Sequence, residues 1–118
     1  MNCTDEGCPT AGVMFGVAGI AVLSAEHRDN ELHLLVESVE RVGGCRVCGV
    51  LAVAHGRRLH VLRDAPFGHR AVVVRWRKRI WRCAERSCPV TTFSEDHPLA
   101  AGRATLTARA IHWAVDAL

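Results

Sequence analysis

The sequence predicts a small α+β domain in which antiparallel β-hairpins surround a cluster of four cysteines, with a helix near the C-terminus. Three observations support this fold class. Segments of alternating apolar and polar residues between residues 20 and 82 predict strands. Two pairs of closely spaced cysteines flank the longest predicted hairpin. The C-terminal residues carry apolar side chains near helical spacing.

Residues 1–19 are predicted to form an N-terminal tail, because terminal residues are usually disordered unless they are tied down. Cys3 and Cys8 in this tail are either half of a second metal site or two free thiols. Two free thiols are the favoured interpretation, since no further cysteine pair is left to complete a second site.

The composition predicts a cytoplasmic protein with reduced thiols and no membrane association. The apolar run from Ala11 to Ala25 has 15 residues, fewer than the roughly 20 that span a bilayer. Asp5 and Glu6 precede this run, whereas an export signal carries basic residues there. With 118 residues and 5% aromatic side chains the chain buries a thin core, and such domains often need a metal or disulfides.

A β domain is predicted over residues 20–96 and begins with a hairpin. Its first strand starts at Ile20, and its second strand covers Leu32 to Val39. Asp29 and Asn30 in the polar turn between them tolerate tight backbone angles.

A second hairpin is predicted to join a short strand over residues 59–62 to the longest strand, Ala71 to Arg82. Alternate residues of a strand point to opposite faces of the sheet. One face, interrupted only by Lys78, is therefore predicted to cover the core through Val72, Val74, Trp76 and Ile80. The other face carries a row of arginines.

Residues 97–118 are predicted to be a linker and one helix. Pro98 and Gly102 indicate the linker, and Thr105 or Thr107 can cap the helix. The apolar residues of this helix predict that it docks on the domain or on another chain, or that the sequence is truncated.

Four cysteines are the predicted ligands of one structural Zn²⁺ ion: Cys45, Cys48, Cys83 and Cys88. The pairs have C-x2-C and C-x4-C spacing with 34 residues between them. Structural zinc takes four tetrahedral ligands, which two close thiolate pairs supply. Four buried or free cysteines are the alternative. A catalytic zinc is disfavoured because four thiolates leave no open position, and His55 and His60 are better explained as surface or loop histidines.

Basic residues are concentrated in the second half of the chain. Residues 57–88 contain ten basic and two acidic residues, whereas residues 1–44 contain two basic and seven acidic ones. Guanidinium groups two residues apart on a strand stand about 6–7 Å from each other, close to the phosphate repeat of a nucleic-acid strand. The predicted DNA-binding residues are Arg75, Arg77, Arg79 and Arg82. A solvated sheet face is the alternative.

The motifs occur in a characteristic order: Cys-x-x-Cys-Gly, a histidine, Arg-Leu-x-x-x-Arg-Asp-x-Pro-x-Gly, Arg-x-x-Arg-Cys-x4-Cys-Pro and Thr-Phe-Ser-Glu. This order resembles the N-terminal zinc-binding domain of a group of DDE-type bacterial insertion-sequence transposases. The resemblance covers residues 20–118. The matching residues are Cys45, Cys48, Gly49, His55, Arg58, Asp64, Pro66, Gly68, Arg79, Arg82, Cys83, Cys88, Phe93 and Glu95, with Thr105 at the start of the final helix.

The resemblance implies a domain that binds the terminal inverted repeats of a mobile element. In that family a helix-turn-helix segment and a DDE catalytic domain follow the zinc domain. The chain ends in what would be the first of those helices, so the resemblance implies a truncated transposase without enzyme activity of its own. The alternative is a protein–protein interaction or homo-oligomerisation module whose final helix contacts the partner.

Overall fold

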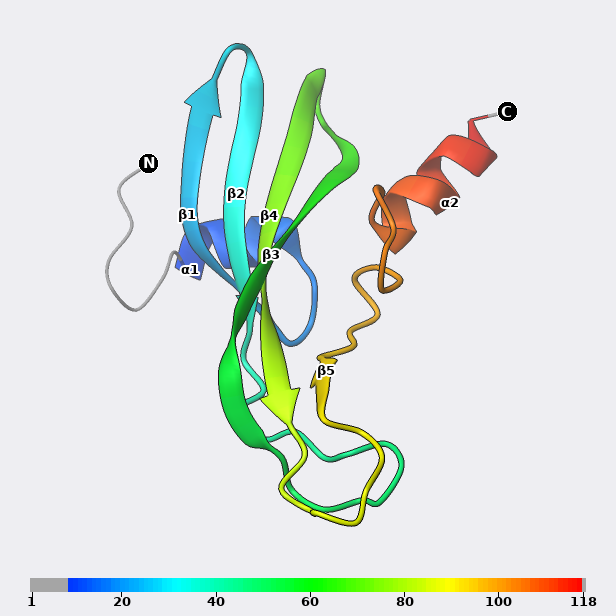
Figure 1. The fold of residues 1–118 in the computed structure, drawn as a ribbon. Coiled ribbons are helices and arrows are strands. Elements are labelled where there is room, and N and C mark those ends of the chain that lie inside the picture. The colour runs from blue at the N-terminus through cyan, green and yellow to red at the C-terminus, as the bar shows by residue number, and fades with distance from the viewer. Residues whose placement is uncertain (1–8, 118) are drawn as a thin grey trace.

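The structure is a computed structural model that describes residues 9–117. It is a small mixed α+β fold dominated by a sheet, with a helix near the C-terminus, as predicted (Figure 1). The elements in chain order are α1 (Pro9–Phe15), β1 (Ile20–Arg28), β2 (Glu31–Ser38), β3 (Val53–Phe67), β4 (Arg70–Arg82), β5 (Thr92–Ser94) and α2 (Ala108–Asp116).

Two antiparallel hairpins build the sheet, and both were predicted from the sequence. Strands β1 and β2 form one hairpin, with Asp29 and Asn30 at positive φ in its turn, and β3 and β4 form the other. The hairpins join through a parallel pair, β2 and β4, in which Leu34 lies opposite Val74. The sheet order is therefore β1-β2-β4-β3, and β5 pairs with the end of β4.

The sequence predicts the two antiparallel hairpins but not the parallel junction that joins them. This junction makes β4 the central strand, with β3 on one side and β2 and β5 on the other. A central strand covered on both faces typically carries a continuous apolar run. Val72, Val73 and Val74 form such a run, and all three are buried.

Strand β3 is much longer than the strand predicted over residues 59–62. It pairs with β4 from Val53 opposite Arg82 to Phe67 opposite Arg70. The loop expected around Gly56 is instead an irregularity within the strand, between Ala54 and Gly56. A local bulge of this kind keeps the pairing continuous while it bends the strand.

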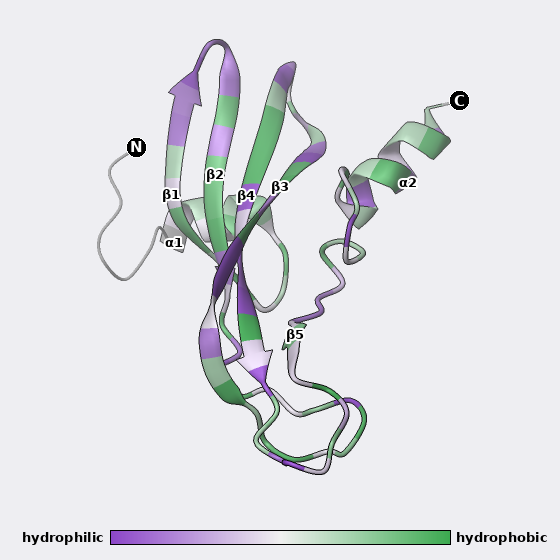
Figure 2. Ribbon diagram, in the orientation of Figure 1, coloured by the Kyte–Doolittle hydropathy of each residue, from purple (hydrophilic) through white to green (hydrophobic). Residues whose placement is uncertain are grey.

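The core lies on one face of the sheet. Val36, Val74 and Trp76 are completely buried there, and Leu99 and Ala100 from the segment after β5 pack against them. Strand β1 becomes hydrophilic towards the hairpin turn, away from this core (Figure 2). The core is therefore formed by the middle of the sheet.

Lys78 belongs to this core face and is only 1% exposed, although the strand pattern predicted that it interrupts the face. Its Nζ donates to the carbonyl oxygen of Gly102 at 3.0 Å and lies 4.6 Å from the centre of the Trp76 ring. Burial lowers the pKa of Lys78, and nearby Arg58 lowers it further. The side chain ties the segment before α2 to the sheet.

Helix α1 lies within the region predicted as an N-terminal tail. Ala11 and Phe15 are one helical turn apart and point into the core, where they are 6% and 4% exposed. In Figure 1 the helix lies behind the sheet, across β1 and β2. The structure differs from the predicted tail over residues 9–15, because two apolar residues at i and i+4 give this short segment a buried helical face.

Helix α2 confirms the predicted C-terminal helix and one of its two candidate caps. The Thr107 side chain accepts a hydrogen bond from the backbone N–H of Ala110 at 3.1 Å. Thr107 is completely buried, because residues 105–107 run beside β3 and exchange backbone hydrogen bonds with Arg63. The cap therefore also docks the start of the helix on the sheet.

Candidate metal centre

The first cysteine pair lies in a tight turn after β2. The backbone N–H of Gly49 donates to the carbonyl oxygen of Cys45 at 2.9 Å, and the N–H of Cys45 donates to Val50 at 2.9 Å. Gly49 has φ of 76°, a conformation that glycine adopts readily. This turn places the thiols of Cys45 and Cys48 close to each other, within the same cysteine cluster.

The second pair lies at the end of β4. The backbone N–H of Cys83 donates to Thr91 at 3.0 Å, and that of Cys88 donates to Glu85 at 3.2 Å. Strand β5 then pairs back onto β4 and closes the loop. The C-x4-C spacing thus forms a second compact turn, although it is wider than the first.

The structure brings all four predicted cysteines together. Their sulfur atoms lie within 4.8 Å of one another, with Cys45 Sγ 3.7 Å from Cys88 and Cys48 Sγ 3.5 Å from Cys83. A tetrahedral ion with bonds of about 2.3 Å to sulfur places its ligands roughly 3.8 Å apart. A disulfide would require about 2.05 Å, so the observed spacing fits shared coordination of one ion better than two disulfides.

The electrostatics of the cluster favour a bound cation. Backbone N–H groups of Cys48 and Val47 lower the pKa of Cys45 to about 6. The N–H of Glu85 also lowers the pKa of Cys83, but burial and the neighbouring thiols Cys48 and Cys45 outweigh it and raise that pKa to about 12. Thiols this close cannot all ionise without a positive charge between them. A bound metal ion would supply that charge.

Gly43 and Trp81 support the first turn from the sheet side. Trp81 is 5% exposed, and a Cβ added to Gly43 would lie 2.6 Å from its ring. The backbone N–H of Ala52 also donates to Gly43 at 2.7 Å. The loop that carries Cys45 therefore rests directly on the indole ring.

Arg46 connects the first turn to β5. Its Nη2 donates to the carbonyl oxygen of Ser94 at 2.7 Å and lies 2.9 Å from Asp96. The guanidinium also lies over the Phe93 ring, 5.7 Å from its centre. Because β5 follows the second cysteine pair, these contacts hold the two pairs at one end of the sheet.

The four arginines predicted to bind DNA lie in different environments. Arg75 is half-buried, and its Nε is buried without a partner. Arg79 is half-buried and donates to the carbonyl oxygen of Ser38 at 3.4 Å. Arg77 and Arg82 are exposed. The four side chains therefore do not form one uniform exposed row.

Acidic residues of β2 lie beside this row, since β2 and β4 are neighbours in the sheet. Glu37 Oε1 lies 2.9 Å from Nε of Arg57 and 3.7 Å from Nη1 of Arg77. Glu31 pairs with Arg63 further along the same sheet. The charge separation seen along the sequence is thus partly cancelled on the folded surface.

Arg82 and Arg86 lie near the cysteines, and among residues 9–117 their guanidinium groups have no partner. Within residues 9–117, neither guanidinium has an ion pair or hydrogen bond, and both residues are exposed. Arg82 directly precedes Cys83, and Arg86 lies between Cys83 and Cys88. Arg86 is not among the four arginines predicted to bind DNA, although its place inside the second cysteine pair was an available signal.

The remaining sequence candidates lie outside the cluster. Among the described residues, His55 and His60 are not part of the metal-ligand group, and His60 Nε2 is 2.6 Å from the carbonyl oxygen of Ala104. Cys3 and Cys8 lie outside the described residues. No helix within residues 9–117 is long and apolar enough to cross a membrane.

Comparison with known proteins adds no assignment. No family model, curated protein or solved structure matches the chain.

Proposed function

We propose that the four cysteines hold one structural Zn²⁺ ion. The sulfur spacing supports this, as does the preference of zinc for tetrahedral thiolate sites. All four positions would be filled by protein ligands, so the ion would fasten the two cysteine pairs together rather than activate water.

Metal analysis of protein purified without added zinc tests this proposal. We expect one zinc per chain, lost when Cys45, Cys48, Cys83 or Cys88 is replaced by serine. Cys3→Ser and Cys8→Ser serve as matched controls and should retain the metal. Protein without stoichiometric metal, or zinc that survives Cys45→Ser, would overturn the assignment.

We further propose that the end of the domain that carries the four cysteines, here called the metal end, binds DNA. The observation that carries this proposal is the pair of exposed, unpaired guanidiniums at Arg82 and Arg86, both attached to the second cysteine turn. Arginine recognises phosphate through its planar fork of donors. A metal that holds this turn in place would also hold the backbone from which both guanidinium groups extend.

A salt titration of duplex DNA binding tests the contacts. Affinity should fall steeply with salt, and Arg82→Gln and Arg86→Gln should each reduce the slope by about one. Arg77→Gln should have a smaller effect because Glu37 already lies near it. Arg28→Gln is the control, since Arg28 pairs with Glu26 in the first hairpin.

Absence of DNA binding at low salt would exclude the proposal. An equal loss of affinity in the Arg28→Gln control would instead indicate a general charge effect, and would remove the assignment to the metal end.

The resemblance to insertion-sequence transposases leads us to propose transposon-end DNA as the target, bound without cleavage. Duplexes from the DNA that borders the gene should compete at least tenfold better than duplexes of scrambled sequence. Equal competition by the bordering and the scrambled duplexes would indicate non-specific DNA binding and would contradict the transposase proposal.

A second candidate function is a protein-interaction module, and helix α2 favours it. Ile111, Trp113 and Val115 are each about half exposed or more, whereas Ala110 is the only buried residue of this helix. Deletion of residues 106–118 would then abolish assembly of copies of the chain in sedimentation experiments, and Arg82→Gln would leave assembly unchanged. A monomer at all concentrations would exclude self-assembly.

A further inference from the structure

A cavity of about 410 Å³ lies beside the turn between β3 and β4. This turn is at the opposite end of the sheet from the loops that follow β2 and β4 (Figure 1). This volume falls within the usual range of small-molecule sites. Helix α1 forms one wall, the first hairpin forms a second, and the ends of β3 and β4 close the remainder. The cavity is independent of the metal centre.

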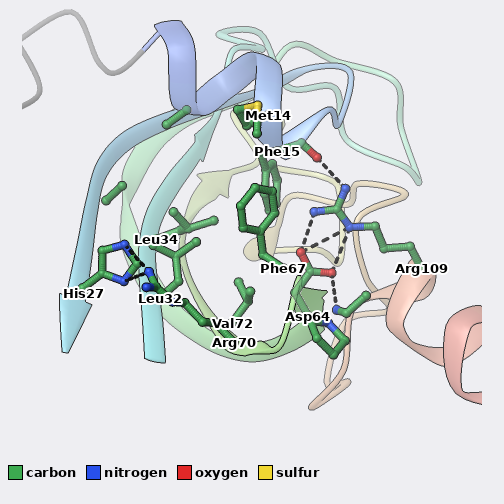
Figure 3. Close-up of a pocket in the computed structure, with 14 residues that line it drawn as sticks. Met14, Phe15, His27, Leu32, Leu34, Asp64, Phe67, Arg70, Val72 and Arg109 are labelled. Carbon is green, nitrogen blue, oxygen red and sulfur yellow. Dashed lines mark hydrogen bonds and ion pairs between the residues drawn. The ribbon is translucent and has the colours of Figure 1, made fainter. Parts of the chain in front are cut away.

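Apolar side chains form the middle of the cavity. Phe15 from α1, Leu34 from β2 and Val72 from β4 are all buried and line it, together with half-buried Leu32 and half-exposed Phe67 (Figure 3). Such walls favour an aliphatic or aromatic body by removing its apolar surface from water.

One of the two guanidiniums in the cavity is already neutralised. Arg109 Nε donates to Oδ1 of Asp64 at 2.9 Å, its Nη2 also bonds to this carboxylate, and its Nη1 donates to the carbonyl oxygen of Phe15. All three nitrogens are occupied, so Arg109 acts as part of the wall.

The second guanidinium, Arg70, has no acidic partner. Its Nη1 lies 2.8 Å and 2.9 Å from the two ring nitrogens of His27, and no carboxylate among residues 9–117 pairs with it. Arg70 and His27 lie on one side of the apolar side chains and the Asp64–Arg109 pair lies on the other (Figure 3). The cavity therefore has one uncompensated positive charge at one edge.

We propose that this cavity binds a small amphipathic carboxylate. The carboxylate pairs with Arg70, where a planar fork of donors matches its two oxygens, and the apolar body lies against Leu34 and Val72. A single free cation favours a monoanion, because Arg109 is already neutralised by Asp64 and leaves no second cation for another negative charge.

Calorimetric titration of the full chain with decanoate, below its micelle concentration, tests the proposal. We expect saturable binding of one decanoate per chain and roughly tenfold weaker binding of decanol, which lacks the charge. Arg70→Gln should weaken decanoate about tenfold and leave decanol unchanged. Arg41→Gln is the matched control, because Arg41 is exposed and lies outside the cavity.

A cavity-filling variant tests whether both ligands bind inside the cavity. Ala65 lines the cavity, so Ala65→Leu should reduce the binding of both decanoate and decanol. In the unmodified chain, decanoate should shift the methyl resonances of Leu34 and Val72 and leave that of Val47 unchanged. Non-saturable binding, equal affinity for decanol, or an unaltered affinity in Arg70→Gln would overturn the proposal.

Discussion

Gly43 sets how closely the loop that carries Cys45 can approach the sheet. An added Cβ would lie within 2.6–2.8 Å of three atoms of the Trp81 ring, closer than such atoms are normally found. The neighbouring Gly44 has nothing within 4 Å of the same position. Two adjacent glycines therefore have different roles, because only one faces the indole.

Gly43→Ala should destabilise the domain by about 1–3 kcal/mol, since the loop or the indole must move to admit the methyl group. It should also weaken zinc binding, because the same loop positions Cys45. Chemical denaturation and competition with a zinc chelator measure the two effects. Gly44→Ala should change neither. Equal behaviour of the two variants would refute the close-contact explanation.

At the scale of elements, α2 is held to the sheet by one carboxylate. The Asp64 side chain is 2% exposed, and its Oδ1 accepts from Thr107 Oγ1 at 2.7 Å as well as from Arg109. Burial raises the pKa of Asp64, but the hydrogen bonds from Arg109 and Thr107 outweigh it and hold the pKa below its usual value. Few apolar side chains of α2 are buried, so this polar contact anchors the helix.

Asp64→Asn should release α2, with a loss of about 1–3 kcal/mol from the unpaired Arg109. Amide hydrogen exchange over residues 108–116 measures the release. Asp116→Asn is the control, because Asp116 is exposed in the same helix. Protection of α2 that is unchanged in Asp64→Asn would show that the anchor lies elsewhere.

The same contact predicts a pH dependence. Because the folded pKa of Asp64 is lowered, its stabilisation is fully present above the unfolded value near 3.9 and is lost as the pH falls below it through the folded pKa. Exchange of α2 amides should therefore accelerate below about pH 4 in the unmodified chain. In Asp64→Asn this acid-induced change should be absent, and its persistence would contradict the assignment.

At the scale of the whole molecule, the hydrophobic core and the metal centre are separate. The core cluster joins α1, the sheet and the segment around Leu99, and it contains none of the four cysteines. The cysteines lie beyond the end of β4 and in the loop after β2. The cysteine cluster therefore organises one end of the sheet, while apolar burial organises the rest.

If the four cysteines hold the proposed zinc, its removal should unfold only the end of the sheet that carries them. With a chelator, amides of residues 43–52 and 83–94 should lose protection from exchange, while those of β1, β2 and the first half of β4 should keep it. Cys45→Ser should show the same pattern without chelator. Cooperative loss of protection throughout the sheet would mean that the core depends on the metal.

The cysteine spacing was sufficient to predict the cluster, because short C-x2-C and C-x4-C turns restrict where each pair can point. Strand alternation and the polar turn at Asp29 and Asn30 were sufficient to predict both hairpins. Thr105 and Thr107 were both recognisable as candidate caps because a hydroxyl before a helix satisfies a free N–H group, and the structure selects Thr107. These are local relations, and the sequence by itself determined them.

Tertiary structure alone decided which distant segments became neighbours. Placing β4 between β2 and β3 brought Glu37 beside Arg77 and buried Lys78 under Gly102, whereas the Arg82 guanidinium has no partner among residues 9–117. Alternation along one strand specifies a face but not the strand that lies next to it. The partner and exposure of each arginine, and the cavity with Arg70 at its edge, depend on that pairing and therefore could not be predicted from sequence periodicity.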